Sequence, residues 1–253
     1  MEIEEVIKKF IKRLFKYYYW KIDKRFLFEV HLADHCNLDC IGCSHFSPIA
    51  EERFLNVDEY KKDCEQFAGI SKKYVKRIHL MGGEPLLHKN IVEIIKITRS
   101  NFEKSAINIV TNGILLDKMD AEFWNTCNKN KIKISLTLYP INLNITKICE
   151  LSLKYGVAIG YFGTGYKMKF RKDSIDEKGI QNKKYSYRKC KALCPQLYEG
   201  KFYMCQKPAY IKYINKYFSK DFIVSPLDYI DIHRLNVAPL HPTIIISLFF
   251  ASE

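Results

Sequence analysis

The sequence predicts an α/β fold with a parallel sheet, and three observations support this. Short apolar runs alternate with amphipathic segments over residues 26–162, a pattern that favours parallel strands joined by right-handed helical crossovers. The polar motifs come directly after the apolar runs, at the edge where α/β barrels carry their active sites. Two short aromatic runs flank Glu199-Gly200, which is typical of a β-hairpin.

The elements follow in order along the chain. Strands are expected at 26–32, 77–81, 107–110, 132–138 and 157–162, and helices at 57–69, 88–100, 117–127 and 145–154. Asn56 is the expected cap of the first of these helices. Residues 2–20 form a further amphipathic pattern with a basic face. Such a helix can lie on a membrane or dock a partner, but we favour packing on its own domain, since burial is the commonest source of helix stability.

Composition limits the class of protein. The chain has 253 residues, 47% of them apolar, enough for one sizeable core with a small appendage. The acidic start and the lack of an apolar segment after it argue against a secretory signal, and no apolar run reaches transmembrane length. Nine cysteines at short spacings favour metal ligands over disulfides, so we expect a reducing, cytoplasmic location.

The net charge is +13, and it is partly local. Ten Lys or Arg residues against three acidic residues lie between Lys167 and Lys191. Such a surface attracts acidic partners, including nucleic acid. We favour a simple solvated surface, because no RNA-binding signature accompanies the charge.

Three cysteines follow the first strand at C-x3-C-x2-C spacing: Cys36, Cys40 and Cys43. Three thiolates can hold three irons of a cubic iron–sulfur cluster and leave the fourth iron open for chemistry. A zinc site is the alternative, with nearby histidines as further ligands. The next strand ends in Gly82-Gly83-Glu84-Pro85, which by itself is only a turn signal.

Together these two motifs resemble the radical S-adenosylmethionine (radical SAM) superfamily. The resemblance implies a partial, open (β/α)6-type barrel that binds a 4Fe-4S cluster and S-adenosylmethionine (SAM). It implies that reductive cleavage of SAM yields a 5′-deoxyadenosyl radical, which abstracts hydrogen from a substrate. The electron would come from a donor such as flavodoxin or ferredoxin. One departure is Gly42, where the family usually has an aromatic residue, and Phe46 is the candidate for that contact.

The resemblance also assigns residues to the cofactors. It makes Cys36, Cys40 and Cys43 the cluster ligands. It places Gly82, Gly83, Glu84 and Pro85 at SAM, with Glu84 accepting from the ammonium group. Asn112 after the third strand and Ser135 on the fourth are further candidates for SAM contacts, Ser135 as the ribose contact. Cys64, Cys127 and Cys149 fall in predicted helices and are expected to be buried apolar residues.

A second cysteine group, Cys190, Cys194 and Cys205, surrounds the predicted hairpin. Its spacing resembles the SPASM and Twitch auxiliary domains, which hold a second iron–sulfur cluster. The expected domains are therefore a helix at 1–24, a radical SAM core at 25–165 and an auxiliary region at 166–253. Because Cys205 is the last cysteine, we expect a chain truncated or frameshifted near Asn236 and a weak second cluster. A buried final strand is the alternative for the apolar run at 243–250.

The leading function is thus a radical SAM oxidoreductase or transferase acting on a peptide, a sugar or another small metabolite, with peptide as the first expectation. A noncatalytic iron–sulfur electron carrier or binding protein is the second hypothesis. A zinc-binding, nucleic-acid-associated protein is the third, and only the charge supports it.

Overall fold

The computed structural model describes residues 26–162, 175–182, 185–186 and 194–234. The predicted helix at 2–20, Cys190 and the tail from residue 235 lie outside the described residues. Within the described part, no helix is long and apolar enough to cross a membrane.

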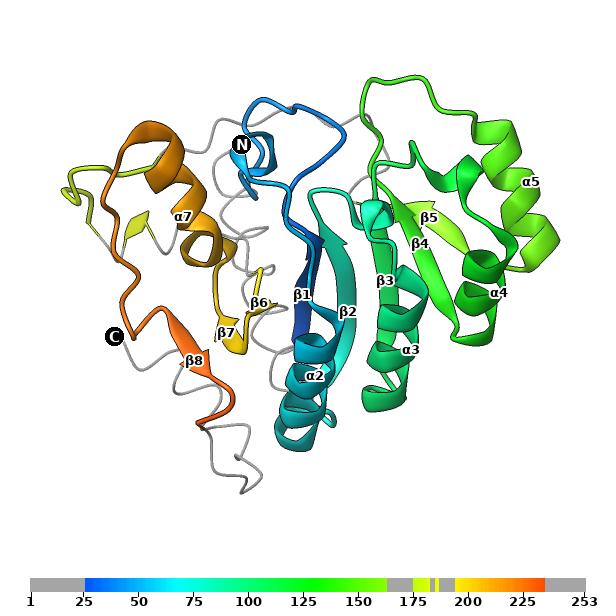
Figure 1. Cartoon of the computed structure of the whole chain (residues 1–253), viewed down its shortest axis with the longest axis horizontal. Coiled ribbons are helices and arrows are strands. Elements are labelled where there is room, and N and C mark those ends of the chain that lie inside the picture. Colours follow the sequence, from blue (N-terminus) through cyan, green and yellow to red (C-terminus); the bar gives the residue numbers. More distant parts are fainter. Residues whose placement is uncertain (1–25, 163–174, 183–184, 187–193, 235–253) are drawn as a thin grey trace, which may run out of the picture.

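The fold is an α/β structure around one twisted sheet (Figure 1). The strand order is β5-β4-β3-β2-β1-β6-β7-β8. Strands β1 to β6 run parallel, and β7 and β8 continue the sheet in antiparallel pairing. The strands are β1 (Phe26–Ala33), β2 (Val75–Gly82), β3 (Ala106–Thr111), β4 (Ile132–Leu136), β5 (Ile159–Tyr161), β6 (Gln196–Tyr198), β7 (Lys201–Tyr203) and β8 (Tyr229–Asp231).

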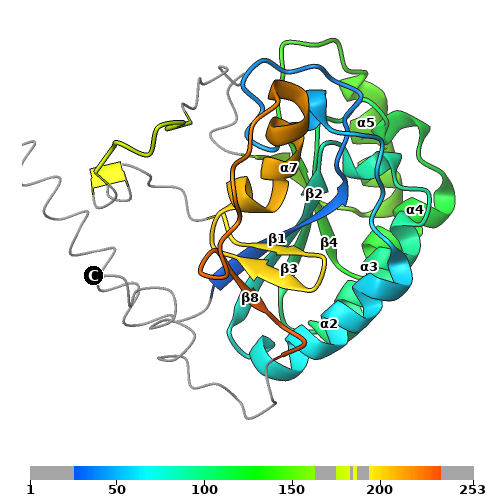
Figure 2. The ribbon, with the colours of Figure 1, turned by 60° about the vertical axis from the view of Figure 1, so that its left-hand side comes forward.

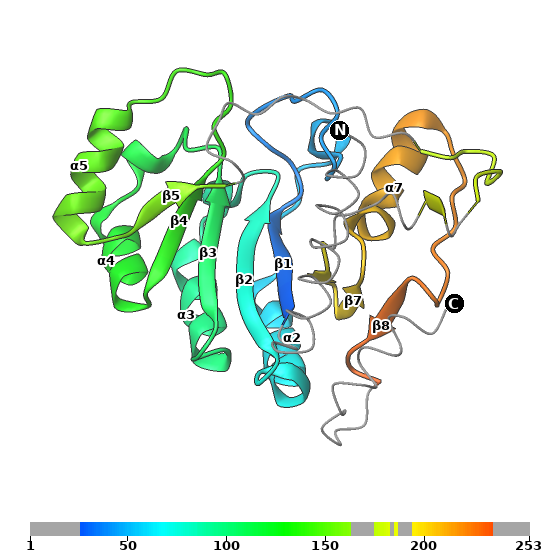
Figure 3. The same ribbon diagram turned by 180° about the vertical axis from the view of Figure 1, so that it is seen from behind.

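Helices cover one face of the parallel strands, and Figure 3 looks onto the opposite face. The α-helices are α2 (Val57–Ser71), α3 (Ile91–Asn101), α4 (Ala121–Lys129), α5 (Ile145–Tyr155) and α7 (Gln206–Phe218). Short 3-10 turns are η1 (Ser47–Ile49), η2 (Pro85–Leu87) and η3 (Leu116–Lys118). Figure 2 shows α2 to α5 along the outside of the curved sheet, whereas α7 lies on its inner side.

Alternation along β1 decides which side chains enter the core. Phe28, Val30 and Leu32 are fully buried and pack against α2 and α3, where Phe28 meets Phe67 edge-on. The residues between them point to the opposite face, because successive strand side chains alternate. This face carries α7 beside β1, where His31 stacks on Tyr210, and we call its part over β2 to β5 the helix-free face. The opposite face is polar, and β1 contributes Glu29 to it.

The expected order of strands and helices is confirmed. Helix α2 begins after Asn56, whose side chain accepts from the Asp58 and Glu59 amides as a helix cap. The hairpin around Glu199-Gly200 is confirmed as β6 and β7. The sixth parallel strand is β6, which pairs with β1 instead of extending the sheet beyond β5. The boundary near residue 165 stays a prediction.

The helix cysteines differ from the expectation at one position. Cys64 and Cys127 are buried, as predicted, and burial raises the pKa of each thiol to about 12. Cys149 is exposed, so that prediction was wrong. The reason is its place on α5, which turns the neighbouring Ile148 toward the core and Cys149 away from it.

Candidate functional site

The cysteine loop and the Gly-Gly turn meet at the carboxyl edge of the sheet. The register of β1 and β2 ends with Ala33 opposite Gly82. Beyond it, the Gly83 amide donates to the Ala33 carbonyl at 2.8 Å, and the Glu84 amide donates to the His35 carbonyl at 3.2 Å. The two predicted motifs are therefore held together by backbone hydrogen bonds.

Only glycine fits this junction. A Cβ atom on Gly83 would lie 2.0 Å from the His35 carbonyl oxygen. A Cβ on Gly82 would lie 2.3 Å from the Ala33 oxygen, and φ at Gly82 is +139°. Because these neighbours are backbone atoms that cannot swing aside, both glycines are required for the approach of the turn to the cysteine loop.

The three loop thiols are close enough to influence one another. Cys36 accepts from the Leu38 amide at 3.4 Å. Burial raises the pKa of the Cys36 thiol to about 11, against that hydrogen bond. Negative charge on Glu84, Cys40 and Cys43 raises it further. Three thiolates at this loop therefore repel one another and need a cation that binds them.

The kind of cation follows from the spacing of the donors. Among the described residues, no three His, Cys, Asp or Glu side chains converge as ligands of a single metal ion. A zinc site needs such convergence. In a cubic cluster each thiolate binds a different iron, so the sulfurs stand apart around the cluster. The described loop thiols are therefore not arranged around a single ion, and the iron–sulfur cluster stays the prediction from their spacing in sequence.

Glu84 is completely buried behind the Gly-Gly turn. Its Oε1 accepts from the Leu86 amide at 3.1 Å and from the Thr111 hydroxyl at 2.7 Å, and its Oε2 accepts from the Asn112 amide at 2.9 Å. Burial raises the pKa of Glu84 to about 7, and these hydrogen bonds oppose the rise. The carboxyl thus links the ends of β2 and β3, a role that the sequence did not indicate. Its predicted contact with the SAM ammonium stays a prediction.

Asn112 connects the end of β3 to the cysteine loop. Its Nδ2 donates to Asn37 Oδ1 at 2.7 Å and lies 3.8 Å from Cys36 Sγ. Pro85 is buried and opens the turn η2. Ser135 is buried on the helix-free face, where its hydroxyl accepts from Asn108 Nδ2 at 3.2 Å. The structure thus places Asn112 beside the cluster loop and Ser135 farther along the helix-free face.

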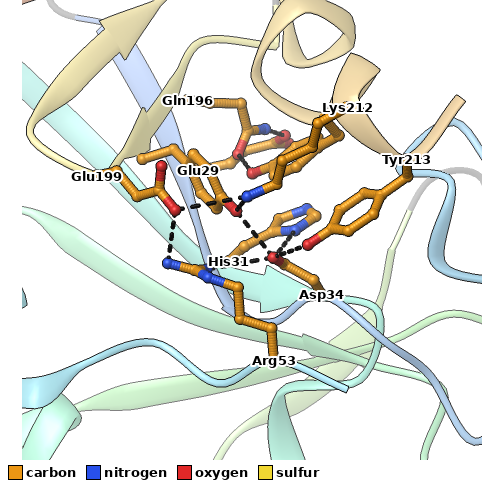
Figure 4. A network of polar contacts seen from close by, with 10 residues as sticks. Glu29, His31, Asp34, Arg53, Gln196, Glu199, Lys212 and Tyr213 are labelled. Carbon is orange, nitrogen blue, oxygen red and sulfur yellow. Dashed lines mark hydrogen bonds and ion pairs between the residues drawn. The ribbon is translucent and has the colours of Figure 1, made fainter. Parts of the chain in front are cut away.

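A buried carboxylate outside the predicted site holds the other side of the cysteine loop (Figure 4). Asp34 follows the last residue of β1, just before the loop, and is 1% exposed. It accepts from Tyr198 at 2.8 Å and from Tyr213, and it pairs with Arg53 at 3.2 Å and His31 at 3.4 Å. Burial opposes its ionisation, but hydrogen bonds from His31 and the tyrosines hold the pKa of Asp34 well below its usual range.

The same network joins the sheet to α7. Arg53 also pairs with Glu199 at 2.8 Å, and Lys212 of α7 donates to Tyr198 at 2.8 Å. Figure 4 shows these side chains converging from the loop after β1, the hairpin and α7. The tyrosines within 206–218 were the one feature of the sequence that could have pointed to this network. The network itself could not be predicted, because it joins residues about 160 positions apart.

A family comparison agrees with the geometry of the two motifs. Residues 30–149 match the model of the Radical SAM superfamily. This part of the chain is therefore similar to radical SAM domains. The family's cofactors are a 4Fe-4S cluster and SAM, and the cysteine loop with its adjoining Gly-Gly turn stays the predicted site for them.

Curated relatives match about a third to a half of the chain. The "GTP 3′,8-cyclase" of Clostridium perfringens strain 13 is 36% identical over 91 residues, which cover 35% of this chain and 27% of that protein. The "Probable GTP 3′,8-cyclase" of Methanocaldococcus jannaschii is 36% identical over 128 residues, covering 49% of this chain and 41% of that protein. The chain therefore spans less than half the length of these relatives.

Solved structures also resemble the chain. A crystal structure of BtrN in complex with AdoMet and 2-DOIA has a TM-score of 0.45 at 23% identity, covering 54% of this chain and 56% of BtrN. Native anSMEcpe with bound AdoMet and Cp18Cys peptide has a TM-score of 0.40 at 17% identity, covering 54% and 42% of the two chains.

At Gly42 the sequence differs from the radical SAM motif, which usually has an aromatic residue there, and the backbone conformation accommodates the difference. Gly42 has φ of +76°, in the left-handed region where an aromatic side chain is unfavourable. Phe46 packs against the aromatic residues of α7 and the hairpin. The adenine contact expected for Phe46 stays a prediction.

The second cysteine group is only partly described. Cys194 and Cys205 stand before and after the β6–β7 hairpin, and neither is in a disulfide. Cys190 lies outside the described residues. The auxiliary cluster of the SPASM or Twitch type therefore stays a prediction.

Proposed function

We propose that this chain is a radical SAM enzyme whose catalytic cluster is held by Cys36, Cys40 and Cys43. One observation carries the proposal: the three-thiol loop and the Gly-Gly turn are hydrogen-bonded together at one carboxyl edge of a parallel sheet. When bound, the cluster and SAM supply a 5′-deoxyadenosyl radical. The enzyme class does not depend on whether the substrate is a peptide, a sugar or another small metabolite.

The chain's own residues have separate roles in this proposal. The loop thiolates leave the fourth iron open because no fourth cysteine ligand follows at this spacing. Gly82 and Gly83 admit the ligand's amino-acid end close to backbone, since they lack Cβ atoms. From the described residues Glu84 Oε2 accepts a single hydrogen bond, so it would have a lone pair for the SAM ammonium. Substrate hydrogen abstraction would take place on the helix-free face below this edge.

Names of relatives support a radical reaction but not a substrate. The matching proteins are named GTP 3′,8-cyclase, and the matches cover 35% and 49% of this chain. A cyclisation is therefore one candidate, in addition to the oxidoreductase or transferase chemistry that the motifs suggest. The auxiliary cluster, the flavodoxin- or ferredoxin-type donor and the cytoplasmic location are parts of the proposal that the geometry of this edge does not address.

The test uses alanine variants of Cys36, Cys40 and Cys43, with Cys149→Ala as the control. After anaerobic reconstitution, each loop variant should lose most cluster iron and sulfide and should form no 5′-deoxyadenosine from SAM under reduction. The control should match wild type, because Cys149 is exposed on α5. A loop variant that still cleaves SAM would refute the assignment. A wild-type chain that binds iron but forms no 5′-deoxyadenosine would support the noncatalytic alternative.

A further inference from the structure

The helix-free face carries a pocket below the predicted cofactor edge. It has a volume of about 390 Å³ and is lined by side chains of β2, β3, β4 and β5. A pocket of this volume suits a small metabolite. Arg77 lies five residues before Gly82 on β2, so the lower end of the pocket is roughly 16 Å from the Gly-Gly turn at a strand rise of about 3.3 Å per residue. The pocket thus lies below that turn along the strands.

Three basic side chains line this pocket: Arg77, Lys131 and Lys133. All three are exposed, and no Asp or Glu is among the lining residues. Within the described part of the chain, none of the three has an ion pair or a side-chain hydrogen bond. Glu29 lies beyond the lining residue His79, at 3.6 Å from its Nδ1, and is already bonded to Gln196.

Two basic residues on the helix-covered side of the same sheet region are partnered. Arg99, on the helix side, donates to the carbonyl oxygens of Asn130 at 2.9 Å and of Ser105 at 2.8 Å. Lys96 lies 3.6 Å from Glu122. The pocket cations have no such partners within the described part of the chain, and their unneutralised charge is concentrated on one concave surface, where it attracts anions.

The backbone makes room for one of these cations. An added Cβ on Gly160 of β5 would lie 2.8 Å from Cε and 3.0 Å from Nζ of Lys133. The absence of a side chain at Gly160 therefore lets the Lys133 ammonium lie across β5 at the pocket. Neutral groups stand beside it, because Asn108 and Ser135 also line the pocket and are hydrogen-bonded to each other at 3.2 Å.

We propose that this pocket binds the phosphoryl group of a small, phosphate-bearing substrate through Arg77, Lys131 and Lys133. Three unpaired cations match the double negative charge of a phosphate ester better than the single charge of a carboxylate, and the guanidinium can donate two parallel hydrogen bonds to it. Asn108 and Ser135 would orient the part of the substrate that extends toward the cofactor edge. Calling the ligand a substrate rests on the proposed function. The inference favours a phosphorylated metabolite over a peptide.

The experiment is calorimetric titration of inorganic pyrophosphate into the full chain without cluster, at low salt, so its outcome does not depend on SAM cleavage. Arg77→Gln and Lys133→Gln should each weaken binding at least tenfold. Lys72→Gln is the matched control, since Lys72 is exposed at the end of α2 on the helix-covered side, and it should bind as wild type does. Circular dichroism of each variant confirms that it is folded.

Three results would overturn the inference. If wild type shows no measurable binding of pyrophosphate, the pocket is refuted, whereas SAM cleavage and the proposed function stay intact. An equal loss in the Lys72→Gln control would show that pyrophosphate responds only to the overall positive charge. Tighter binding of malonate, or of a single-stranded oligonucleotide that the glutamine variants no longer bind, would assign the pocket to a dicarboxylate or to nucleic acid instead.

Discussion

Two buried carboxyl groups follow neighbouring strands, and their pKa values are shifted in opposite directions. Asp34 at the end of β1 is 1% exposed and Glu84 after β2 is 0% exposed. Asp34 has a guanidinium, from Arg53, as a partner, whereas Glu84 accepts only from neutral amides and a hydroxyl. Hydrogen bonds from His31, Tyr213 and Tyr198 hold the pKa of Asp34 far below its usual range against the effect of burial, whereas burial raises the pKa of Glu84 to about 7. Both groups are buried, so the hydrogen-bond partners of each carboxyl, and not burial alone, decide the direction of its pKa shift.

The largest loss of stability is expected when Glu84, the acceptor of three neutral donors, is removed. Glu84→Ala removes the carboxyl that accepts from the Leu86 and Asn112 amides and the Thr111 hydroxyl. Each buried donor left unsatisfied costs roughly 1–3 kcal/mol. We expect the free energy of unfolding to fall by about 4 kcal/mol, with urea denaturation as the measurement. Glu65→Ala, at an exposed position of α2, is the control and should change it by less than about 0.5 kcal/mol. Equal stability of the two variants would mean that the Glu84 contacts contribute nothing.

The raised pKa of Glu84 predicts a pH effect of defined sign. Its pKa is about 7 in the folded chain against 4.5 for an unperturbed glutamate. The folded state therefore holds the proton more tightly, and this stabilisation is complete below pH 4.5 and is lost as the pH rises through 7. Glu84→Gln has no proton to lose. Between pH 4.5 and 8, wild type should lose about 3 kcal/mol relative to Glu84→Gln.

The measurement is urea denaturation of the cluster-free chain at several pH values in that range. His31, whose pKa is lowered by burial, titrates in both proteins and cancels in the difference. Asp34 also cancels, because the stabilisation from its lowered pKa is lost only below its unfolded value of 3.8. Parallel curves for wild type and Glu84→Gln would show that Glu84 stays in one protonation state.

Much of the fold was predictable from the sequence because its signals are local. Apolar runs such as 26–32 and the motifs that follow them identified the parallel strands and the active edge. The partner of β6 was not predictable, because pairing of Leu197 with Val30 joins positions far apart in sequence. The exposure of Cys149 was missed because helical spacing alone does not show which edge of α5 faces solvent.

The site was predictable where residue type and spacing carry the chemistry. The cysteine loop and the Gly-Gly turn have such spacing, and the structure joins them. The supports of that site carry no such signal: Thr111 and Asp34 are ordinary residues whose partners come from other elements. The pocket cations could not be identified in a lysine-rich sequence, since only the tertiary structure distinguishes Lys133 from a solvated lysine.

The smallest expected effect belongs to the charged carboxylate. Asp34→Asn keeps an oxygen that can accept from Tyr198 and Tyr213 but removes the charge that faces Arg53. Breaking a fully buried ion pair costs about 3–5 kcal/mol. The Arg53 side chain is 31% exposed, so water compensates part of its charge, and we expect a loss of about 2 kcal/mol.

The location of this loss of stability shows whether Asp34 supports one region or the whole fold. Asp34 bonds Tyr213 of α7, so hydrogen exchange should accelerate at the amides of α7 and of the cysteine loop more than in α3. Asp221→Asn, at an exposed aspartate, is the control and should leave exchange unchanged. If exchange rose equally in α3 and α7, Asp34 would support the whole sheet and not the attachment of α7. A local increase would mean that the charged carboxylate fixes the cysteine loop against α7, while the neutral hydrogen bonds of Glu84 fix the Gly-Gly turn against β3.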